Sequence, residues 1–374
     1  MVTPEQLYRW LSAAGVDFFA GVPDSLLKAF CAYVTDHAPK GRHVITSNEG
    51  GAIALAMGYH LATGRIGAVY MQNSGLGNAV NPLTSLADPA IYGVPMLLIV
   101  GWRGEPGHKD EPQHVQMGRV TRATLEAIGV PHTVLPEDPA DAAAAVTAAL
   151  ADVQQRQAAH ALVIRKGTFE SYALQTKVAQ PYETTREQAI ERFVASLPAD
   201  ALVVSTTGKP SRELFEVRRG RGEPHRDFLT VGGMGHASQI ALGLALECPD
   251  RPVYCLDGDG AVLMHLGGLS TIATLAPANY RHVVVNNGAH DSVGGQPTVA
   301  FEVDLCAVAT ACGYRSTRRV TEATELDAAF AELSAGTGPA MVEVRVKIGS
   351  RADLGRPTMT PQELKRAIRD YVTG

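Results

Sequence analysis

The stretch Val253-Tyr-Cys-Leu-Asp-Gly258-Asp259-Gly260, followed further along by Arg281-His-Val-Val-Val-Asn286-Asn287, decides the fold. Each part opens with a short apolar run, which is typical of a buried parallel strand. The first run ends in Gly-Asp-Gly and the second in Asn-Asn. Because ligands of an open parallel sheet bind at the carboxyl ends of its strands, we expect these two polar tips to lie at one mouth.

The residue types at these tips suit a diphosphate and a metal ion. Glycines let the backbone approach a diphosphate closely, and helix N-terminal amides bind one. Asp259 and Asn287 supply the hard oxygen ligands that Mg²⁺ prefers. A dinucleotide fingerprint needs a third glycine where this chain has Leu263, and no P-loop Gly-Lys-Ser/Thr is present. The simpler alternative is a tight turn at Gly258–Gly260 and an Asn287 that caps a helix.

Length and composition set the broad class. The 374 residues are enough for two domains, and 45% hydrophobic with 19% charged residues allows a sizeable core. The net charge of −5 without a basic tract argues against nucleic acid as a partner. No apolar run reaches the length of a membrane span.

The termini and cysteines indicate a cytoplasmic protein. Met1-Val-Thr-Pro-Glu lacks the basic and apolar regions of a signal peptide. The 5 cysteines are scattered and form no Cys-x-x-Cys pair, so we expect reduced core residues and no zinc site.

Apolar runs alternate with helical patterns along both halves of the chain. Further strands are predicted at Val16–Ala20, Val44–Thr46, Gly67–Gln72, Pro95–Val100, Ala161–Arg165, Ala201–Ser205, Phe228–Val231 and Ala340–Val346. Capping boxes predict helix starts at Thr3–Gln6, Thr185–Gln188 and Thr360–Glu363. This alternation predicts an α/β protein with two doubly wound parallel-sheet domains. We place the domains at residues 1–172 and 185–374, with a polar linker at residues 173–184.

The Gly-Asp-Gly to Asn-Asn segment resembles the signature of thiamine diphosphate (ThDP) enzymes. The resemblance covers nearly the whole chain and implies a pyrimidine-binding domain, residues 1–172, and a diphosphate-binding domain, residues 185–374. Each would hold a six-stranded sheet, with no middle domain between them. Further stretches resemble one subfamily, the phosphonopyruvate decarboxylases, and sulfopyruvate decarboxylase shares part of this set: Gly21–Ser25, Gln72–Asn78, Lys109–His114, Thr207–Glu213 and Asn286–Pro297.

The resemblance assigns the cofactor contacts. Glu49 aligns with the glutamate that hydrogen-bonds the aminopyrimidine, a role that requires a carboxyl group in a dry pocket. Taken alone, Glu49 would only be an acid in the first turn of a helix. Met234 matches the apolar residue wedged between the two cofactor rings, and its alternative is gap-filling core.

The metal and diphosphate contacts follow from the same resemblance. Asp259 and Asn287 would ligate Mg²⁺ through their side chains, and Ala289 through its backbone carbonyl. Four more residues would touch the cofactor mainly through their backbone: Gly232, Gly258, Gly260 and Ala261.

For the residues that act on the substrate, the sequence offers several candidates. Three histidines are candidates for handling the proton or the oxyanion: His114, His236 and His290. His114 falls where larger decarboxylases carry the first residue of a histidine pair, but the second position here is Val115. Asp24 or Ser25 occupies a polar turn near the substrate, and the sequence leaves open which one points inward.

A phosphonate carries up to two negative charges and needs cationic donors. Loops at predicted strand ends supply Arg103, His108, Lys109, Lys209 and Arg212, and His236 is a further candidate contact. Lys109 and Lys209 are the strongest candidates because they lie inside the subfamily stretches, although Lys209 also suits the cofactor diphosphate. Each of these side chains, taken alone, is explained equally well as a solvated charge on a surface loop.

The resemblance implies ThDP- and Mg²⁺-dependent decarboxylation of 3-phosphonopyruvate to phosphonoacetaldehyde and CO₂ in phosphonate biosynthesis. Sulfopyruvate decarboxylation, a carboligase activity and a non-catalytic partner subunit are the alternatives. A partner subunit typically lacks either Glu49 or the Asp259/Asn287 pair, and this chain has both. The resemblance also implies a homo-oligomer in which Glu49 of one subunit serves the cofactor bound to Asp259 of another.

Overall fold

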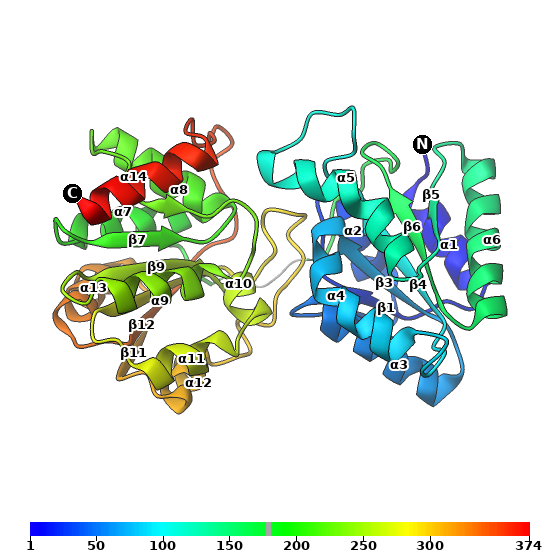
Figure 1. The fold of residues 1–374 in the computed structure, drawn as a ribbon, viewed down its shortest axis with the longest axis horizontal. Coiled ribbons are helices and arrows are strands. Elements are labelled where there is room, and N and C mark those ends of the chain that lie inside the picture. The colour runs from blue at the N-terminus through cyan, green and yellow to red at the C-terminus, as the bar shows by residue number, and fades with distance from the viewer. Residues whose placement is uncertain (177–180) are drawn as a thin grey trace. The chain divides into compact units, whose positions relative to one another are not determined.

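The computed structural model describes residues 1–176 and 181–374 (Figure 1). The chain forms two compact units, each built around one six-stranded sheet. The linker predicted at residues 173–184 falls partly on residues 177–180, which lie outside the described residues, so the domain boundaries stay a prediction.

The first unit has a fully parallel sheet with the strand order β2-β1-β3-β4-β6-β5. Its strands are β1 (Phe19–Gly21), β2 (His43–Ile45), β3 (Gly67–Gln72), β4 (Met96–Gly101), β5 (His132–Val134) and β6 (Ala159–Ile164). Its helices are α1 (Pro4–Ala13), α2 (Lys28–His37), α3 (Glu49–Thr63), α4 (Leu76–Pro82), α5 (Pro112–Ala127) and α6 (Pro139–Arg156), with short turns η1 (Asn73–Gly75) and η2 (Leu83–Ala87).

Both faces of this sheet are covered by helices. On β4, Leu97 and Ile99 pack into the core shared with α1, α2 and α6. The alternate residues Met96, Leu98 and Val100 pack with α3, α4 and α5 on the other face. Because successive strand residues point to opposite faces, a continuous apolar run is what a sheet covered on both sides requires.

The second unit has a parallel sheet with the order β11-β12-β10-β9-β7-β8. Its strands are β7 (Leu202–Ser205), β8 (Phe228–Leu229), β9 (Val253–Gly258), β10 (Tyr280–Asn286), β11 (Ser316–Val320) and β12 (Ala340–Arg345). Its helices are α7 (Arg186–Ser196), α8 (Lys209–Gly220), α9 (Ala237–Glu247), α10 (Asp259–Met264), α11 (Gly268–Leu275), α12 (Leu305–Cys312), α13 (Leu326–Ala335) and α14 (Pro361–Thr373), with the turn η3 (Ala323–Glu325). Helices α7 and α8 cover one face and α9, α11 and α12 the other (Figure 1).

The predicted fold class is confirmed, and the two units share one topology. When strands are counted from one within each unit, both sheets have the order 2-1-3-4-6-5. All three predicted capping boxes form. The sequence patterns missed β5 and β11, and the strand predicted from Val16 begins only at Phe19. No helix in the described part of the chain is long and apolar enough to cross a membrane.

Candidate active site

The carboxyl end of β9 carries the Gly-Asp-Gly turn. Asp259 is the first residue of α10 and only 4% exposed, and Thr298 donates its hydroxyl to Asp259 Oδ2 over 2.6 Å. Burial raises the pKa of Asp259 to about 6. Ala261 is buried in the same helix turn, while Gly258 and Gly260 are half-buried. The predicted cofactor residues of this turn therefore surround a carboxylate that is shielded from water.

The neighbouring strand β10 brings the Asn-Asn pair to the same edge of the sheet. The strand register places Val285 beside Gly258, so Asn287 and Asp259 follow directly from paired strands. Asn287 is buried, and its Oδ1 accepts a hydrogen bond from Ala289 N over 3.1 Å. This register agrees with the prediction from the sequence that the polar residues after the two strands lie at the same edge of the sheet.

A glycine-rich turn follows β8. Gly232, Gly233 and Gly235 have φ values of +77°, +57° and +87°, a region that side chains with a Cβ rarely adopt. Gly232 N donates to Thr207 Oγ1 over 3.1 Å, which links the turn to the loop after β7. Met234 is half-buried within this turn. The left-handed backbone explains why glycine stands at residue 233.

In the first unit, Glu49 begins α3 behind the N-cap Asn48, whose side chain accepts from Gly51 N over 2.8 Å. Glu49 is 5% exposed, and Asn78 donates its amide to Glu49 Oε2 over 2.7 Å. A Cβ on residue 75 would lie 2.6 Å from Glu49 Cγ, so glycine at position 75 makes room for this carboxylate. The Glu49 side chain is thus enclosed and held by a neutral hydrogen-bond donor.

The structure distinguishes Asp24 from Ser25. Asp24 is fully buried and accepts hydrogen bonds from Leu26 N at 2.7 Å and Gln72 Nε2 at 2.7 Å. Burial raises the pKa of Asp24 although these hydrogen bonds oppose the shift. Ser25 is half-buried, and its hydroxyl accepts from Arg103 Nη1 over 2.7 Å. Asp24 therefore holds the turn internally, and Ser25 joins the polar groups around Arg103.

The three candidate histidines have different surroundings. His114 lies in α5 and is 8% exposed; burial and the nearby Arg103 charge lower its pKa to about 4. Burial likewise lowers the pKa of His290 to about 4. His236 is exposed, with its ring 4.4 Å from that of His265. His114 and His290 are therefore neutral at pH 7.

Two candidate substrate cations already have carboxylate partners. Arg103 Nε donates to Asp110 Oδ2 over 2.8 Å, and Lys209 Nζ lies 3.0 Å from Asp291 Oδ2. Lys109 and His108 are exposed on the loop before α5, and Arg212 is half-buried in α8. The net positive charge near these side chains is thus smaller than a count of basic residues implies.

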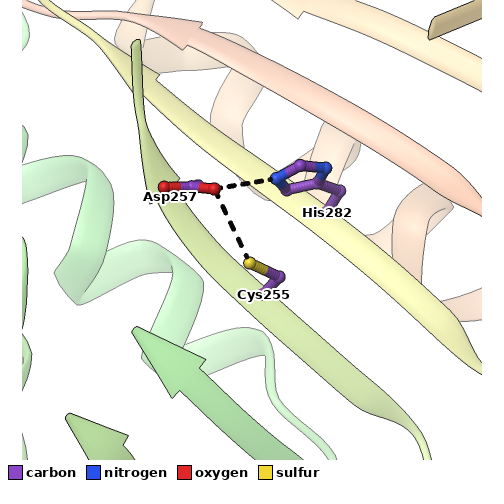
Figure 2. Close-up of side chains that lie close together, drawn as sticks. All are labelled: Cys255, Asp257 and His282. Atoms are coloured by element: carbon purple, nitrogen blue, oxygen red, sulfur yellow. Dashed lines mark hydrogen bonds and ion pairs between the residues drawn. The ribbon is translucent and has the colours of Figure 1, made fainter. Parts of the chain in front are cut away.

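A cluster beneath the Gly258 turn joins Cys255 and Asp257 of β9 to His282 of β10 (Figure 2). His282 Nε2 lies 3.5 Å and Cys255 Sγ 4.0 Å from Asp257 Oδ2, and all three side chains are buried. Asp257 Oδ1 accepts from Gly258 N over 3.0 Å. The cluster is part of the buried core, and its contact with the Gly258 turn is the hydrogen bond from Gly258 N to Asp257.

Several residues of the site carry no readable role in the sequence. Gln72 and Asn78 lie inside a stretch that resembles the decarboxylases, but their partners Asp24 and Glu49 are distant in the chain. Thr298, which binds Asp259, lies in no recognisable motif. Only the resemblance of whole stretches could have drawn attention to Gln72 and Asn78.

Comparison with known proteins adds to this geometry. Residues 1–125 match the family described as "Thiamine pyrophosphate enzyme, N-terminal TPP binding domain". Residues 208–344 match "Thiamine pyrophosphate enzyme, C-terminal TPP binding domain". A phosphonopyruvate decarboxylase of Streptomyces viridochromogenes is 40% identical over 100% of this chain and 96% of its own length. The chain belongs to the phosphonopyruvate decarboxylase family of thiamine pyrophosphate enzymes.

Two further relatives are similar to this chain over nearly their whole length. The phosphonopyruvate decarboxylase of Streptomyces hygroscopicus is 38% identical, over 100% of this chain and 94% of that protein. The sulfopyruvate decarboxylase of Methanosarcina acetivorans is 27% identical, over 99% of this chain and 98% of that protein. The resemblance inferred from the sequence motifs is thereby confirmed, with both TPP-binding domains present.

Proposed function

We propose that this protein decarboxylates 3-phosphonopyruvate to phosphonoacetaldehyde and CO₂, with ThDP and Mg²⁺, in the cytoplasm and as a step of phosphonate biosynthesis. The main support is full-length similarity at 40% and 38% identity to two phosphonopyruvate decarboxylases. The buried Glu49 and Asp259 add a physical argument, because enclosed carboxylates at strand ends are typical of catalytic and metal-binding sites.

The residues of the second unit suit a magnesium diphosphate. Asp259, Asn287 and the Ala289 carbonyl form a set of hard oxygen donors, which Mg²⁺ prefers over nitrogen or sulfur ligands. Gly232, Gly258, Gly260 and Ala261 would contact the cofactor through their backbone, and Met234 would pack between its rings. Bound ThDP would supply the electron sink that decarboxylation of a 2-oxo acid requires.

Further residues, from the first unit and with His290 from the second, would bind the aminopyrimidine and orient the substrate. Glu49, held by Asn78, would hydrogen-bond the aminopyrimidine. At pH 7 the neutral His114 and His290 would donate N–H hydrogen bonds to the substrate, because a pKa of about 4 leaves few protonated molecules. Ser25 and Arg103 would orient the carboxylate or phosphonate.

We infer that the working form is a homo-oligomer, at least a dimer, in which Glu49 of one copy serves the cofactor held by Asp259 of another. The support is the family resemblance. A sedimentation measurement at assay concentration tests this, and a fully active monomer would contradict it.

Sulfopyruvate is the second candidate substrate. A sulfonate carries one negative charge where a phosphonate carries nearly two. Because Arg103 and Lys209 are already paired with Asp110 and Asp291, fewer cations remain for a doubly charged group. The similarity to the Methanosarcina acetivorans sulfopyruvate decarboxylase points the same way.

Parallel assays with phosphonopyruvate, sulfopyruvate and pyruvate, each with ThDP and Mg²⁺, test the proposal. We expect phosphonopyruvate to give the highest kcat/KM and Glu49→Gln to lower the release of CO₂ and aldehyde by roughly 10²–10⁴-fold. The matched control is Glu5→Gln, since Glu5 forms an exposed ion pair with Arg9 at the surface of the first unit. Preference for sulfopyruvate would overturn the substrate assignment, and a product with a new C–C bond would indicate a carboligase. No turnover of any substrate would favour a non-catalytic partner subunit.

A further inference from the structure

The six residues from Asn286 to Asp291 connect β10 to the loop beyond it and include Asn287, Ala289 and His290. We call this segment the 286–291 turn. Its middle is fixed by Gly288, whose carbonyl accepts from Thr298 N over 2.9 Å and whose φ is +66°. A Cβ on residue 288 would also lie 2.6 Å from the Phe301 ring. Close packing and a hydrogen bond therefore fix the backbone conformation at the centre of the turn.

The beginning of the turn is held by Asn286. This side chain is fully buried and donates to Glu343 Oε1 over 2.7 Å and to Ala300 O over 3.1 Å. Its own Oδ1 accepts from Gly288 N over 3.0 Å. Both amide hydrogens and the amide oxygen thus have partners, which leaves the Asn286 side chain one orientation.

Glu343 is itself a fully buried carboxylate on β12. Arg319 Nε donates to its Oε2 over 2.8 Å, and Arg345 Nε lies 2.7 Å from its Oε1. A buried carboxylate is costly unless cations and hydrogen bonds satisfy it, and this one meets both conditions. Since the arginines fix the carboxylate, Glu343 offers Asn286 an acceptor at a set position.

A second charged group holds the far end of the turn. Arg186 Nη1 donates to Asp291 Oδ2 over 3.2 Å, and Lys209 Nζ lies 3.0 Å from the same oxygen. Arg186 is 4% exposed and also binds Glu213 through two hydrogen bonds of 2.6 and 2.8 Å. Asp291 is thereby tied to the first turns of both α7 and α8.

We propose that Glu343 and Asp291 are positioning residues for the metal of the cofactor. They hold the two ends of the 286–291 turn, so that the Asn287 side chain and the Ala289 carbonyl face the metal without reorganisation on binding. This inference rests on the proposed function, which supplies the metal. Groups that orient metal ligands typically change metal affinity by roughly 10–100-fold when they are replaced.

The experiment is a titration of the full-length protein with Mn²⁺, which uses the same oxygen ligands and whose free ion is followed by electron paramagnetic resonance. Glu343→Gln and Asp291→Asn remove one charge each at nearly constant volume. We expect each to weaken Mn²⁺ binding by roughly 10–100-fold. The matched control is Asp327→Asn, because Asp327 forms an exposed ion pair with Arg192 in the same unit. Its Mn²⁺ affinity should stay within about twofold of the wild-type value.

A second measurement separates positioning from general loss of structure. At saturating Mg²⁺ both variants should recover kcat to within about threefold of wild type, while the half-saturating Mg²⁺ concentration stays raised. Should Glu343→Gln fail to fold, Asn286→Ala removes the hydrogen bond to Glu343, together with those to Ala300 and Gly288, and leaves the arginine pairs of Glu343 in place. The two substitutions together should weaken binding by less than the sum of their separate effects, because both act on the hydrogen bond between Asn286 and Glu343.

Folded variants that bind Mn²⁺ as tightly as wild type would overturn this inference alone. Lowered kcat that high Mg²⁺ does not restore would also overturn it, since the residues would then act on catalysis or folding and not on the metal. A wild-type protein that binds no Mn²⁺ in the presence of ThDP would instead refute the proposed function and this inference with it.

Discussion

The two units have the same strand order, and each encloses a buried acid at a strand-to-helix junction, after the second strand in the first unit and after the third in the second. Both place a buried acid at the first position of a helix that follows a strand: Glu49 begins α3 and Asp259 begins α10. An acid is favourable there because the helix dipole presents positive partial charge. Glu49 accepts a hydrogen bond from the amide of Asn78, whereas Asp259 accepts one from the hydroxyl of Thr298.

The difference teaches that a strand-to-helix junction encloses an acid at either place in this topology, and that the neighbouring residues decide which ligand the acid suits. Around Asp259 lie glycines and the oxygen-rich turn after β10, which suit a metal diphosphate. Around Glu49 lie Asn78 and the small Gly75, which leave space for one carboxylate, and among the described residues Glu49 belongs to no cluster of metal-ligating side chains. Removing each acid separately is therefore the most direct way to test the comparison.

The largest effects are expected from Asp259→Asn and Glu49→Gln, which should fail for different reasons. Asp259→Asn should abolish the rise in melting temperature caused by ThDP with Mg²⁺, because the charged metal ligand is lost. Glu49→Gln should keep that rise and lower kcat by roughly 10²–10⁴-fold, the range for a lost proton-transfer group. Thermal shift and CO₂ release measure the two effects. Loss of cofactor binding in both variants would break the proposed division of roles.

A smaller effect is expected from Gly75→Ala, which adds one methyl group against the Glu49 carboxylate. Displacing Glu49 should cost about 1–3 kcal/mol of stability and reduce kcat, with ThDP binding less affected. Gly77→Ala is the control, since a Cβ on residue 77 would meet nothing within 4 Å. Chemical denaturation and steady-state kinetics provide the values. Equal behaviour of the two variants would show that Glu49 is not confined by residue 75.

The first unit should also lose stability in acid through His43, whose pKa burial lowers from 6.5 to about 4. Between pH 6.5 and 4, His43 is protonated in the unfolded chain and neutral in the folded chain. The free energy of unfolding therefore has its full value above pH 6.5 and falls as the pH decreases towards 4. At pH 5 the loss is about 2 kcal/mol. We expect His43→Gln to flatten this dependence in urea unfolding at pH 7.5 and 5.0. The exposed His37→Gln should not, and a parallel effect of both would contradict the assignment.

The smallest effect is expected from the exposed pair of Arg192 and Asp327, which joins two helices on the surface of the second unit. Exposed ion pairs contribute about 0–1 kcal/mol. Asp327→Asn should therefore change the free energy of unfolding by less than about 0.5 kcal/mol and leave kcat/KM unchanged. A decrease of more than about 2 kcal/mol in the free energy of unfolding would mean that this exposed ion pair stabilises the fold as much as a buried one.

Two of the four edge strands, β5 and β11, mark the limit of prediction from sequence for the fold. Central strands such as β4 and β10 are buried on both faces, so their apolar runs were recognised. The strands β5 and β11 lie at the edges of their sheets and are partly exposed. Ser316–Val320 reads Ser-Thr-Arg-Arg-Val, which has no apolar run to recognise. Only its pairing with β12 makes it a strand.

For the site, the sequence by itself determined the residue types and their order along the chain. Glycines, Asp259 and Asn287 at predicted strand ends pointed to a metal diphosphate because those groups are chemically suited to it at any position. Glu49 and the cationic loops came only through resemblance, since a single acid or lysine has no distinctive local pattern.

Tertiary structure decided which of these groups are paired and which are enclosed. It buried Asp24 under Gln72 and left Ser25 beside Arg103, a choice that the sequence left open. It also joined Asn286 to Glu343 and Asp291 to Arg186, residues separated by 57 and 105 positions. Hydrogen bonds and ion pairs depend on distances of a few ångströms, and no local pattern encodes the distance between residues so far apart in the chain.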